Sequence, residues 1–292
     1  MNRTIARAIT RQPSKTKPLS RLAGWDIKTA NLFERYLSVY QKLPSYKKIL
    51  NSMIRFEEMY QPVRKGRWQV DIFDQIGALN EERRCERAKI YMYKRDLINT
   101  IDDIKGKRIV VTSRGHKIFY RDYPLARLRK EKWDSNWTVV MYDFPEKIRS
   151  KRNYIREKLM KFGFGSPQIS ILISPLPLEE PVQKLIEGEK VKNFVWVLTS
   201  KRLWGMDNKE VAQKTWPVDE LDFLYNTLLK ALPPAKKEGI LDQWKEYFLA
   251  TNTADPYLPL ELLPKTWAGG RCEKEFVKLG FGGALRLLLR KA

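Results

Sequence analysis

Histidine and cysteine are almost absent from this chain of 292 residues, which holds one His and two Cys. Cys85 and Cys272 lie far apart and have no C-x-x-C spacing, which excludes a cysteine-type zinc site and a disulfide framework. The single histidine, His116, cannot form a histidine-rich metal site, and a Ser–His–Asp triad would depend on it alone. So little cysteine is typical of a reducing compartment, and we expect a cytoplasmic protein.

Long apolar runs and nucleotide-binding motifs are also missing. No stretch approaches the roughly 18 consecutive apolar residues of a membrane span, so we expect no membrane partner. The motif G-x-x-x-x-G-K-[ST] is absent, which excludes a P-loop NTPase. Gly163-Phe164-Gly165 follows a helical pattern rather than a strand, so it indicates a helix stop and not a phosphate cradle. We expect no cofactor.

Acidic residues are scarce in the N-terminal part of the chain. Residues 1–130 contain 30 Lys or Arg and 13 Asp or Glu, whereas the rest of the chain contains 26 and 21. Basic residues that gather in one part of a chain favour a polyanionic partner, most simply nucleic acid. A solvated surface tuned for solubility is the alternative, but it would not require this clustering.

The first 25 residues contain six basic residues, two prolines and no acid. This composition is typical of a flexible basic arm, which would add phosphate contacts beside a DNA-binding domain. It also fits an organelle transit peptide.

The range 80–98 predicts a helix with two different faces. Asn80 is a good cap, and Ile90, Tyr93 and Leu97 share one side at helical spacing. Arginine and lysine side chains with one aromatic take the other side, as a recognition helix requires for contacts with guanine edges or phosphates.

A short basic hairpin and a third helix follow. Thr100–Ile104 and Arg108–Val111 predict two strands joined by Lys-Gly-Lys, and the sequence T-S-R-G-H-K at 112–117 opens a helix. A basic helix, a hairpin and a threonine-led helix indicate a winged helix-turn-helix, with the helix in the major groove and the wing on the backbone. The residues that we expect to contact double-stranded DNA are Arg83, Arg84, Arg87, Tyr91, Lys94, Arg95, Lys105, Lys107, Arg108 and Arg114.

The segment 137–199 predicts a small α+β domain. Thr138–Phe144 is a β-branched run that Pro145 stops, and a basic helix, ended by Gly163, follows it. Gln168–Ile173 and Asn193–Thr199 predict further strands, with a helix over Leu178–Glu187 between them. Alternating strands and helices of this length favour a ferredoxin-like domain. Asp143 is expected to cap the helix that begins at Pro145.

The C-terminal part predicts helices. Lys201–Lys214 is polar and predicts a loop, and the next helix is expected to begin at Trp216-Pro217 and to stop at Pro233-Pro234. Helices over Leu241–Ala250 and Cys272–Arg290 follow, on either side of a Leu- and Pro-rich loop at Asp255–Gly270.

Several of these motifs resemble the PaaX-type transcriptional repressors. They are D-F-P-E at 143–146, R-x-x-x-R at 152–156, Q-I-S-I-L-I-S-P at 168–175, and D-P-Y-L-P-L-E-L-L-P-K-T-W-A-G at 255–269. The resemblance covers residues 137–280 well, with Ala268 in place of the family's usual proline. It implies a winged-helix domain, a dimerising central domain similar to the CRISPR adaptation nuclease, and a helical C-terminal domain.

The expected domains are therefore a basic arm (1–25), a winged helix (26–130), a ferredoxin-like dimerisation domain (131–205) and a helical domain (206–292). The resemblance implies a homodimeric DNA-binding regulator that acts as a repressor. A small-molecule or acyl-CoA effector would release it from DNA. An alternative is a metal-dependent nuclease of the CRISPR or toxin type, in which Asp143 of each copy in the dimer binds one shared divalent cation. A structural nucleic-acid binder without an effector is a third reading.

Overall fold

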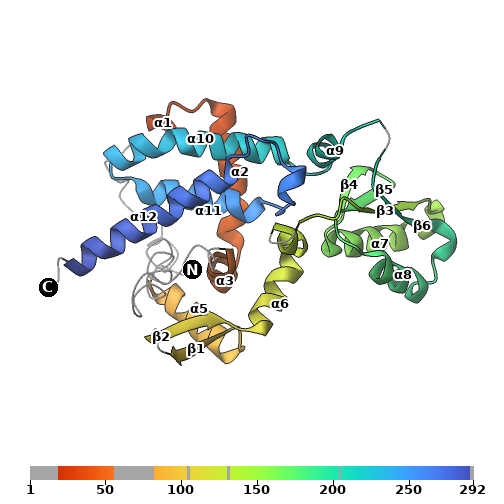
Figure 1. The fold of residues 1–292 in the computed structure, drawn as a ribbon, viewed down its shortest axis with the longest axis horizontal. Helices are drawn as coiled ribbons and strands as arrows, with labels where there is room; N and C mark the ends of the chain where they lie inside the picture. The colour runs from red at the N-terminus through yellow and green to blue at the C-terminus, as the bar shows by residue number, and fades with distance from the viewer. Residues whose placement is uncertain (1–18, 56–81, 104–105, 130–131, 204, 290–292) are drawn as a thin grey trace, which may run out of the picture.

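The computed structural model describes residues 19–55, 82–103, 106–129, 132–203 and 205–289 (Figure 1). Lys105, at the tip of the expected wing, lies outside this part of the chain. The structure mixes helices with two antiparallel sheets, which confirms the α+β class. None of the described helices has the length and apolar character that crossing a bilayer would require.

The central domain contains a four-stranded antiparallel sheet with the strand order β4-β5-β3-β6. Taken along the chain, its elements alternate as β-α-β-β-α-β, which is the ferredoxin-like arrangement. The predicted strand at Gln168–Ile173 is instead a hairpin, because the chain turns at residues 169–170. The elements are β3 (Trp137–Tyr142), α7 (Arg149–Phe162), β4 (Gly165–Gln168), β5 (Ile171–Ser174), α8 (Glu179–Gly188) and β6 (Val195–Ser200).

The two faces of this sheet are covered differently. Val140, Tyr142 and Leu172 point to the side covered by α7 and α8 and form one hydrophobic cluster with them. Trp137 and Val139 point to the other side and pack against the connector before β3 and the C-terminal segments. The second face is therefore what attaches the sheet to the rest of the molecule.

Gly163 ends α7 as predicted, with a φ of 100° in the left-handed region that glycine adopts freely. The start of the helix differs from the prediction. A short 3-10 turn, η2 (Glu146–Ile148), precedes α7, and neither start has a side-chain cap. The predicted capping role of Asp143 is therefore wrong. Its backbone N–H instead donates to the carbonyl of Phe194 at 2.9 Å.

Helix α5, the hairpin and α6 follow one another in the order predicted for a winged helix. Helices α2 and α3 precede them, and the 3-10 segment η1 follows and leads to the central domain. The bounds are α2 (Ile27–Lys42), α3 (Ser45–Arg55), α5 (Glu82–Lys94), β1 (Ile98–Asp103), β2 (Gly106–Val111), α6 (Ser113–Asp122) and η1 (Pro124–Arg129).

The C-terminal part differs from the prediction at two places. The expected loop at Lys201–Lys214 contains a helix, α9, and the long helix α10 continues through Pro233 and Pro234 instead of stopping there. The elements are α9 (Asn208–Thr215), α10 (Val218–Lys237), α11 (Leu241–Ala254), η4 (Leu260–Leu262) and α12 (Gly269–Leu289).

The N-terminal and C-terminal helices share one hydrophobic core. Phe33 of α2, Ile49 of α3 and Met92 of α5 are buried in the same cluster as Leu228 and Trp244. Helix α11 packs against α2, and α10 and α12 pack against α11, with the central domain at the far end of the molecule (Figure 1). The ranges 26–130 and 206–292, expected as separate domains, thus meet in one folded body.

Folded structure begins earlier than the expected arm allows. A short helix, α1 (Leu19–Leu22), lies inside the range 1–25, and Leu19 is completely buried in the main core. Its backbone N–H donates to Oε1 of Gln243 at 2.9 Å. Trp25 stacks on Phe33, with ring centroids 4.3 Å apart. Residues 19–25 therefore belong to the folded body, and the rest of the expected arm lies outside the described residues.

Candidate nucleic-acid interface

Helix α5 buries a narrow stripe and exposes a broad basic one. Ala88 and Met92 are buried, and the second is completely enclosed. The prediction that Ile90 faces the core is wrong, since this side chain is 51 % exposed. The helix ends at Lys94, so Leu97 reaches the core from the following turn and not from the helix. The buried stripe therefore runs through Ala88 and Met92.

The exposed side of α5 carries the predicted cations. The exposed residues of the helix on this side are Arg87, Ile90, Tyr91 and Lys94, and Arg95 is exposed directly after the helix. Tyr91 lies against Tyr46 of α3, with ring centroids 4.7 Å apart, and the Arg95 guanidinium lies 5.6 Å from the Tyr91 ring. The aromatic residue therefore ties this face to α3 and holds one arginine in place.

The hairpin is joined to the end of α5 by several hydrogen bonds. Asp96 has a φ of 54°, which reverses the chain after the helix. Thr112 closes this turn, because its hydroxyl donates to the Asp96 carbonyl at 2.5 Å and its N–H donates to the Leu97 carbonyl at 3.0 Å. Tyr93 and Thr100 share a hydrogen bond between hydroxyls at 2.7 Å. These hydrogen bonds therefore fix the base of the hairpin, here called the hairpin root, at the C-terminal end of α5.

Thr112 also begins α6, as the sequence predicted. Its side-chain oxygen accepts from the N–H of Gly115 at 3.1 Å. Gly115 is buried at the point where α6 crosses the hairpin root, and a Cβ there would lie 2.4 Å from the Leu97 carbonyl oxygen. Only glycine permits this approach, so helix and hairpin are packed as one unit.

The predicted DNA-contact residues fall into two groups. Arg87, Tyr91, Lys94, Arg95 and Arg114 are placed as exposed side chains. Lys107 and Arg108 lie in β2, where the register sets them opposite Asp102 and Ile101. Only the backbone is described for Arg83, Arg84, Lys107 and Arg108, which form the second group with Lys105.

The sequence reasoning missed two further cations on α6. Lys117 and Arg121 are exposed and follow Arg114 three and seven residues later, so they continue along one side of the helix. The spacing was visible in the sequence. The helix was recognised by its cap alone, and its basic side was not traced further.

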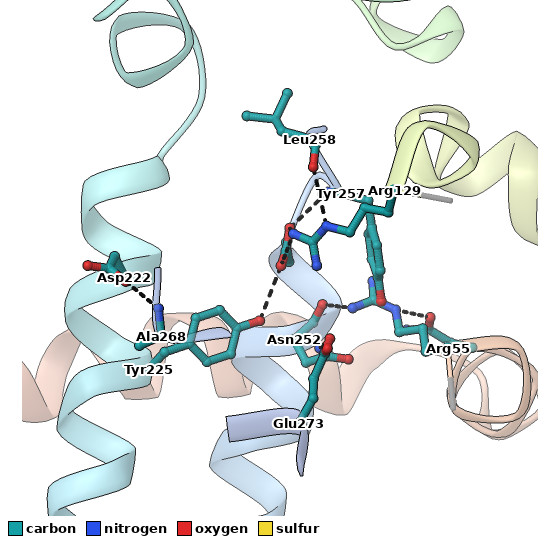
Figure 2. A network of polar contacts seen from close by, with 11 residues as sticks. Arg55, Arg129, Asp222, Tyr225, Asn252, Tyr257, Leu258, Ala268 and Glu273 are labelled. Atoms are coloured by element: carbon teal, nitrogen blue, oxygen red, sulfur yellow. Dashed lines mark hydrogen bonds and ion pairs between the residues drawn. The ribbon is translucent and has the colours of Figure 1, made fainter. Parts of the chain in front are cut away.

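Behind this surface lies a buried polar network that links α3, η1, α11 and α12 (Figure 2). Arg129 of η1 donates to both carboxylate oxygens of Asp255, at 2.9 and 3.0 Å. Arg55 of α3 donates to the carbonyl of Asn252, and the Asn252 amide donates to Glu273 at 3.1 Å. Four segments distant in the sequence therefore meet through charged groups.

Tyr257 lies between the two arginines. The Arg55 guanidinium stands 3.6 Å from the centre of its ring and that of Arg129 stands 4.8 Å away. Tyr257 has a φ of 63°, a strained conformation for an aromatic residue that the surrounding packing must hold. The Tyr257 hydroxyl and Nη2 of Arg55 are buried without a hydrogen-bond partner among the described residues.

Burial changes the pKa values of this network. It lowers the pKa of Arg55 to about 10, because the charged form is removed from water. It also raises the pKa of Glu273, although Arg129 opposes the change. For Arg129 burial acts against the charge, but attraction to Asp255 and neighbouring groups outweighs it and the pKa rises. Charge in this network is therefore stabilised mainly at the Arg129–Asp255 pair.

The central domain also matches a known family. Residues 130–212 match the model described as the PaaX protein central Cas2-like domain. This range contains the whole four-stranded sheet and the start of α9. The central domain is therefore similar to the central domain of PaaX proteins. The resemblance inferred from the motifs is thus confirmed for this part of the chain.

Similar proteins extend the comparison. The transcriptional repressor PaaX of Escherichia coli (strain K12) is 24% identical over 162 residues, which are 50% of this chain and 51% of that protein. The chain thus spans about half the length of the curated relative that it matches. A solved structure, uncharacterized protein Rv0674 from Mycobacterium tuberculosis, is 18% identical with a TM-score of 0.45, covering 80% of this chain and 94% of that one.

Ala268 is the position at which the resemblance led us to expect a proline. Its side chain is buried, and its backbone N–H donates to Oδ1 of Asp222 at 2.8 Å (Figure 2). Proline has no N–H and could not make this bond. Alanine at this position therefore permits a hydrogen bond between α10 and the residue that precedes α12.

Asp143 follows β3, the first strand of the PaaX-type central domain, and is exposed. Among the described residues, no group of three or more His, Cys, Asp or Glu side chains is placed to hold a metal ion. A metal at Asp143 would thus require the carboxylate of a second copy, as the alternative reading supposed.

Proposed function

We propose that this protein is a DNA-binding transcriptional regulator that acts as a repressor. The observation that carries the proposal is the exposed basic side of α5, fixed to a hairpin and to the threonine-capped α6. In a winged helix this helix enters the major groove and the hairpin lies along the neighbouring backbone. The similarity to the repressor PaaX supports the same reading.

The chemistry of the α5 surface suits duplex DNA. Arginine side chains can donate two hydrogen bonds to one guanine, and lysine or arginine can pair with phosphates. Ile90 lies exposed among them and offers an apolar contact of the kind made with thymine methyl groups. The low acid content of residues 1–130 leaves the attraction to phosphate largely unopposed.

We propose that the protein acts as a homodimer through the central domain. Trp196 and Leu198 lie exposed on the second face of the sheet, beside Met141 and Ile171, which are half-buried against the cluster of the connector and α9. These four side chains are here called the open sheet face. Trp196 is 55 % exposed and Leu198 is 38 % exposed. Two copies that pack these faces together would bury them around a two-fold axis.

Such a dimer would present two α5 helices to DNA. The expected operator is an inverted repeat with half-sites about one helical turn apart. An acyl-CoA thioester or another small molecule is the expected effector, and here the support is the family resemblance alone.

The test is a gel-shift titration with DNA sites selected from a random pool. Arg87→Ala is expected to relax sequence preference, because it removes a group aimed at base edges. Lys107→Ala is expected to weaken binding to all sequences alike and to reduce the salt dependence, because it removes a phosphate contact. Lys184→Ala on α8, far along the chain from this surface, is the matched control and should bind as the wild type does.

Two results would contradict the placement of the DNA surface. One is unchanged retention of DNA by both the Arg87 and the Lys107 variants. The other is a wild-type protein that ignores duplex DNA even at low salt, where phosphate contacts are strongest.

A metal-dependent nuclease is the second candidate, and the exposed position of Asp143 after β3 is the observation that favours it. Labelled RNA and DNA with Mg²⁺ would be incubated with the wild type and with Asp143→Asn. Equal background hydrolysis by both proteins would end this candidate.

A further inference from the structure

A cavity of about 530 Å³ opens between helices α3 and α6 on one side and α7 of the central domain on the other. Its walls come from the end of α2, from α3, from α6 with the two residues that follow it, and from α7. The volume falls within the range of roughly 300–1,000 Å³ that is usual for small-molecule sites. Every residue that lines it belongs to the described part of the chain.

The inner wall of the cavity is apolar. Leu50 of α3 and Phe119 of α6 are buried, whereas Met160 of α7 is 44 % exposed. Phe119 and Tyr123 place two rings side by side, with centroids 5.1 Å apart. Flat aromatic walls and an adaptable methionine suit a ligand with a flat apolar body.

The rim of the cavity has an excess of positive charge on the α3 and α6 side. Asp122 is the one acidic lining residue there, and it pairs with both Lys47 at 2.6 Å and Arg121 at 3.5 Å. Across the opening, Lys161 pairs with Glu157 at 2.5 Å. One carboxylate thus serves two cations, and the Arg121 side chain is 67% exposed. An anionic group would find its charge partner at Arg121.

We propose that this cavity binds a small organic anion with a flat apolar body and one carboxylate, phosphate or sulfonate group. The apolar body packs on Leu50, Phe119 and Met160, and the anionic group pairs with Arg121. As a regulatory site the cavity depends on the proposed DNA-binding function, but as a binding site it does not.

The position of the cavity gives its ligand a way to act on the DNA-binding surface. Asn51 and Tyr123 line the cavity, and the Asn51 amide donates to the Tyr123 hydroxyl at 3.3 Å. Oδ1 of Asn51 accepts a hydrogen bond from the Arg55 guanidinium, which lies 4.7 Å from the centre of the Tyr123 ring. A ligand that touches these residues contacts the buried network, and through Met160 it contacts the central domain.

The test uses the full chain and the fluorescent probe 1-anilinonaphthalene-8-sulfonate, which joins a flat apolar body to one sulfonate. Binding is titrated without DNA. Arg121→Gln removes the exposed cation and should weaken binding by about five- to tenfold. Met160→Trp fills the cavity from an exposed position and should abolish saturable binding. Circular dichroism would verify that both variants are folded.

Two matched variants separate this site from other surfaces. Lys184→Gln removes an exposed cation from α8, and Trp196→Ser removes apolar surface from the open sheet face. Both should bind the probe as the wild type does. Equal probe affinity in the wild type, Arg121→Gln and Met160→Trp would overturn the proposal, as would loss of binding in Trp196→Ser alone.

A second arm adds DNA and the saturating probe together. The probe should change the DNA affinity of the wild type and leave that of Met160→Trp unchanged. If the probe binds as expected but no DNA is bound, the cavity stands and the DNA-binding function fails. If DNA is bound and the cavity variants still bind the probe as the wild type does, the cavity assignment fails alone.

Discussion

Single buried charges hold distant parts of this chain together. Arg129 and Asp255 form a buried ion pair in which Nη2 of Arg129 donates to both carboxylate oxygens, and the two side chains are 15% and 1% exposed. Removal of one partner from such a pair leaves the other charge buried and typically costs about 3–5 kcal/mol. Arg55 has no carboxylate in direct contact among the described residues and relies on two aromatic rings, a carbonyl and an amide oxygen. The Arg129 charge is therefore neutralised by a carboxylate, whereas the Arg55 charge is held by hydrogen bonds and ring contacts alone.

Glu273 should make stability depend on pH. Its raised pKa means that the folded state holds a proton after the unfolded chain has released it, so stability falls as pH rises through the folded pKa. Glu273→Gln keeps an oxygen for the Asn252 amide but cannot ionise. Urea unfolding at pH 4.5 and 7.5 should therefore show a gain in stability of the variant over the wild type as pH rises.

The control for this titration is Glu187→Gln, an exposed carboxyl on α8. Its difference in unfolding free energy from the wild type, measured at the same two pH values, is the baseline for the Glu273 variant. A constant difference for Glu273→Gln would show that the buried carboxyl does not titrate in this range.

Sequence reasoning succeeded at residues whose role depends on near neighbours. Thr112 and Gly163 were assigned to a helix start and a helix stop, and both are confirmed. Asp143 was assigned to a cap because aspartate before proline often opens a helix, but the 3-10 turn moved the start of α7 beyond its reach. The buried polar network of Figure 2 could not be predicted, because its members are brought together only by tertiary packing.

At the scale of elements, local signals were overridden where packing was strong. Pro233 and Pro234 usually end a helix, since each lacks an N–H. Here α10 continues past them because Leu228, Ala231 and Leu232 before them and Ala235 after them are buried in the main core. The missed helix α9 had a readable signal. Asp207 and Glu210 form a capping box, with Asp207 accepting from two backbone N–H groups.

Gly115 should control how the hairpin sits on α6. In Gly115→Ala the new Cβ would meet the Leu97 carbonyl and a Val111 methyl at 2.4 and 2.5 Å, so the hairpin root must shift. Overpacking of this kind costs about 1–3 kcal/mol. Chemical unfolding should show this loss, and DNA affinity should fall in the same variant.

Gly188→Ala is the matched control, because a Cβ at this last residue of α8 would meet nothing within 4 Å. Its unfolding free energy should stay within about 0.5 kcal/mol of the wild type, as for most surface substitutions. The idea of a sterically fixed hairpin would fail if Gly115→Ala were equally well tolerated.

At the scale of the whole molecule, the sequence predicted which helices and strands form better than it predicted which of them pack together. The ferredoxin-like class of the central domain followed from local patterns, although one of its three predicted strands is a hairpin of two strands, and so did the order of helix, hairpin and helix. The shared core did not, since apolar stripes on α2 and α10 give no information on which helix each one meets. The buried residues Leu37 and Leu228 are compatible with many partners, and only the folded chain selects one.

The open sheet face gives the last prediction, which concerns assembly. Trp196→Glu places a charge at the centre of the proposed dimer contact, where it would be buried without a partner. Sedimentation should show a dimer for the wild type and a monomer for the variant. A dimer engages both half-sites at once and so binds more tightly than a monomer that engages one. The affinity of the variant for an inverted-repeat site should therefore fall by about 100-fold or more.

Phe223→Glu on α10 is the control for this experiment, since it also replaces an exposed aromatic residue with a charge, but on the helical body. It should remain dimeric and bind the inverted repeat normally. A Trp196→Glu protein that stays dimeric would place the contact between copies on another surface. A monomeric variant that still binds the inverted repeat at full affinity would instead show that one copy reads the DNA alone.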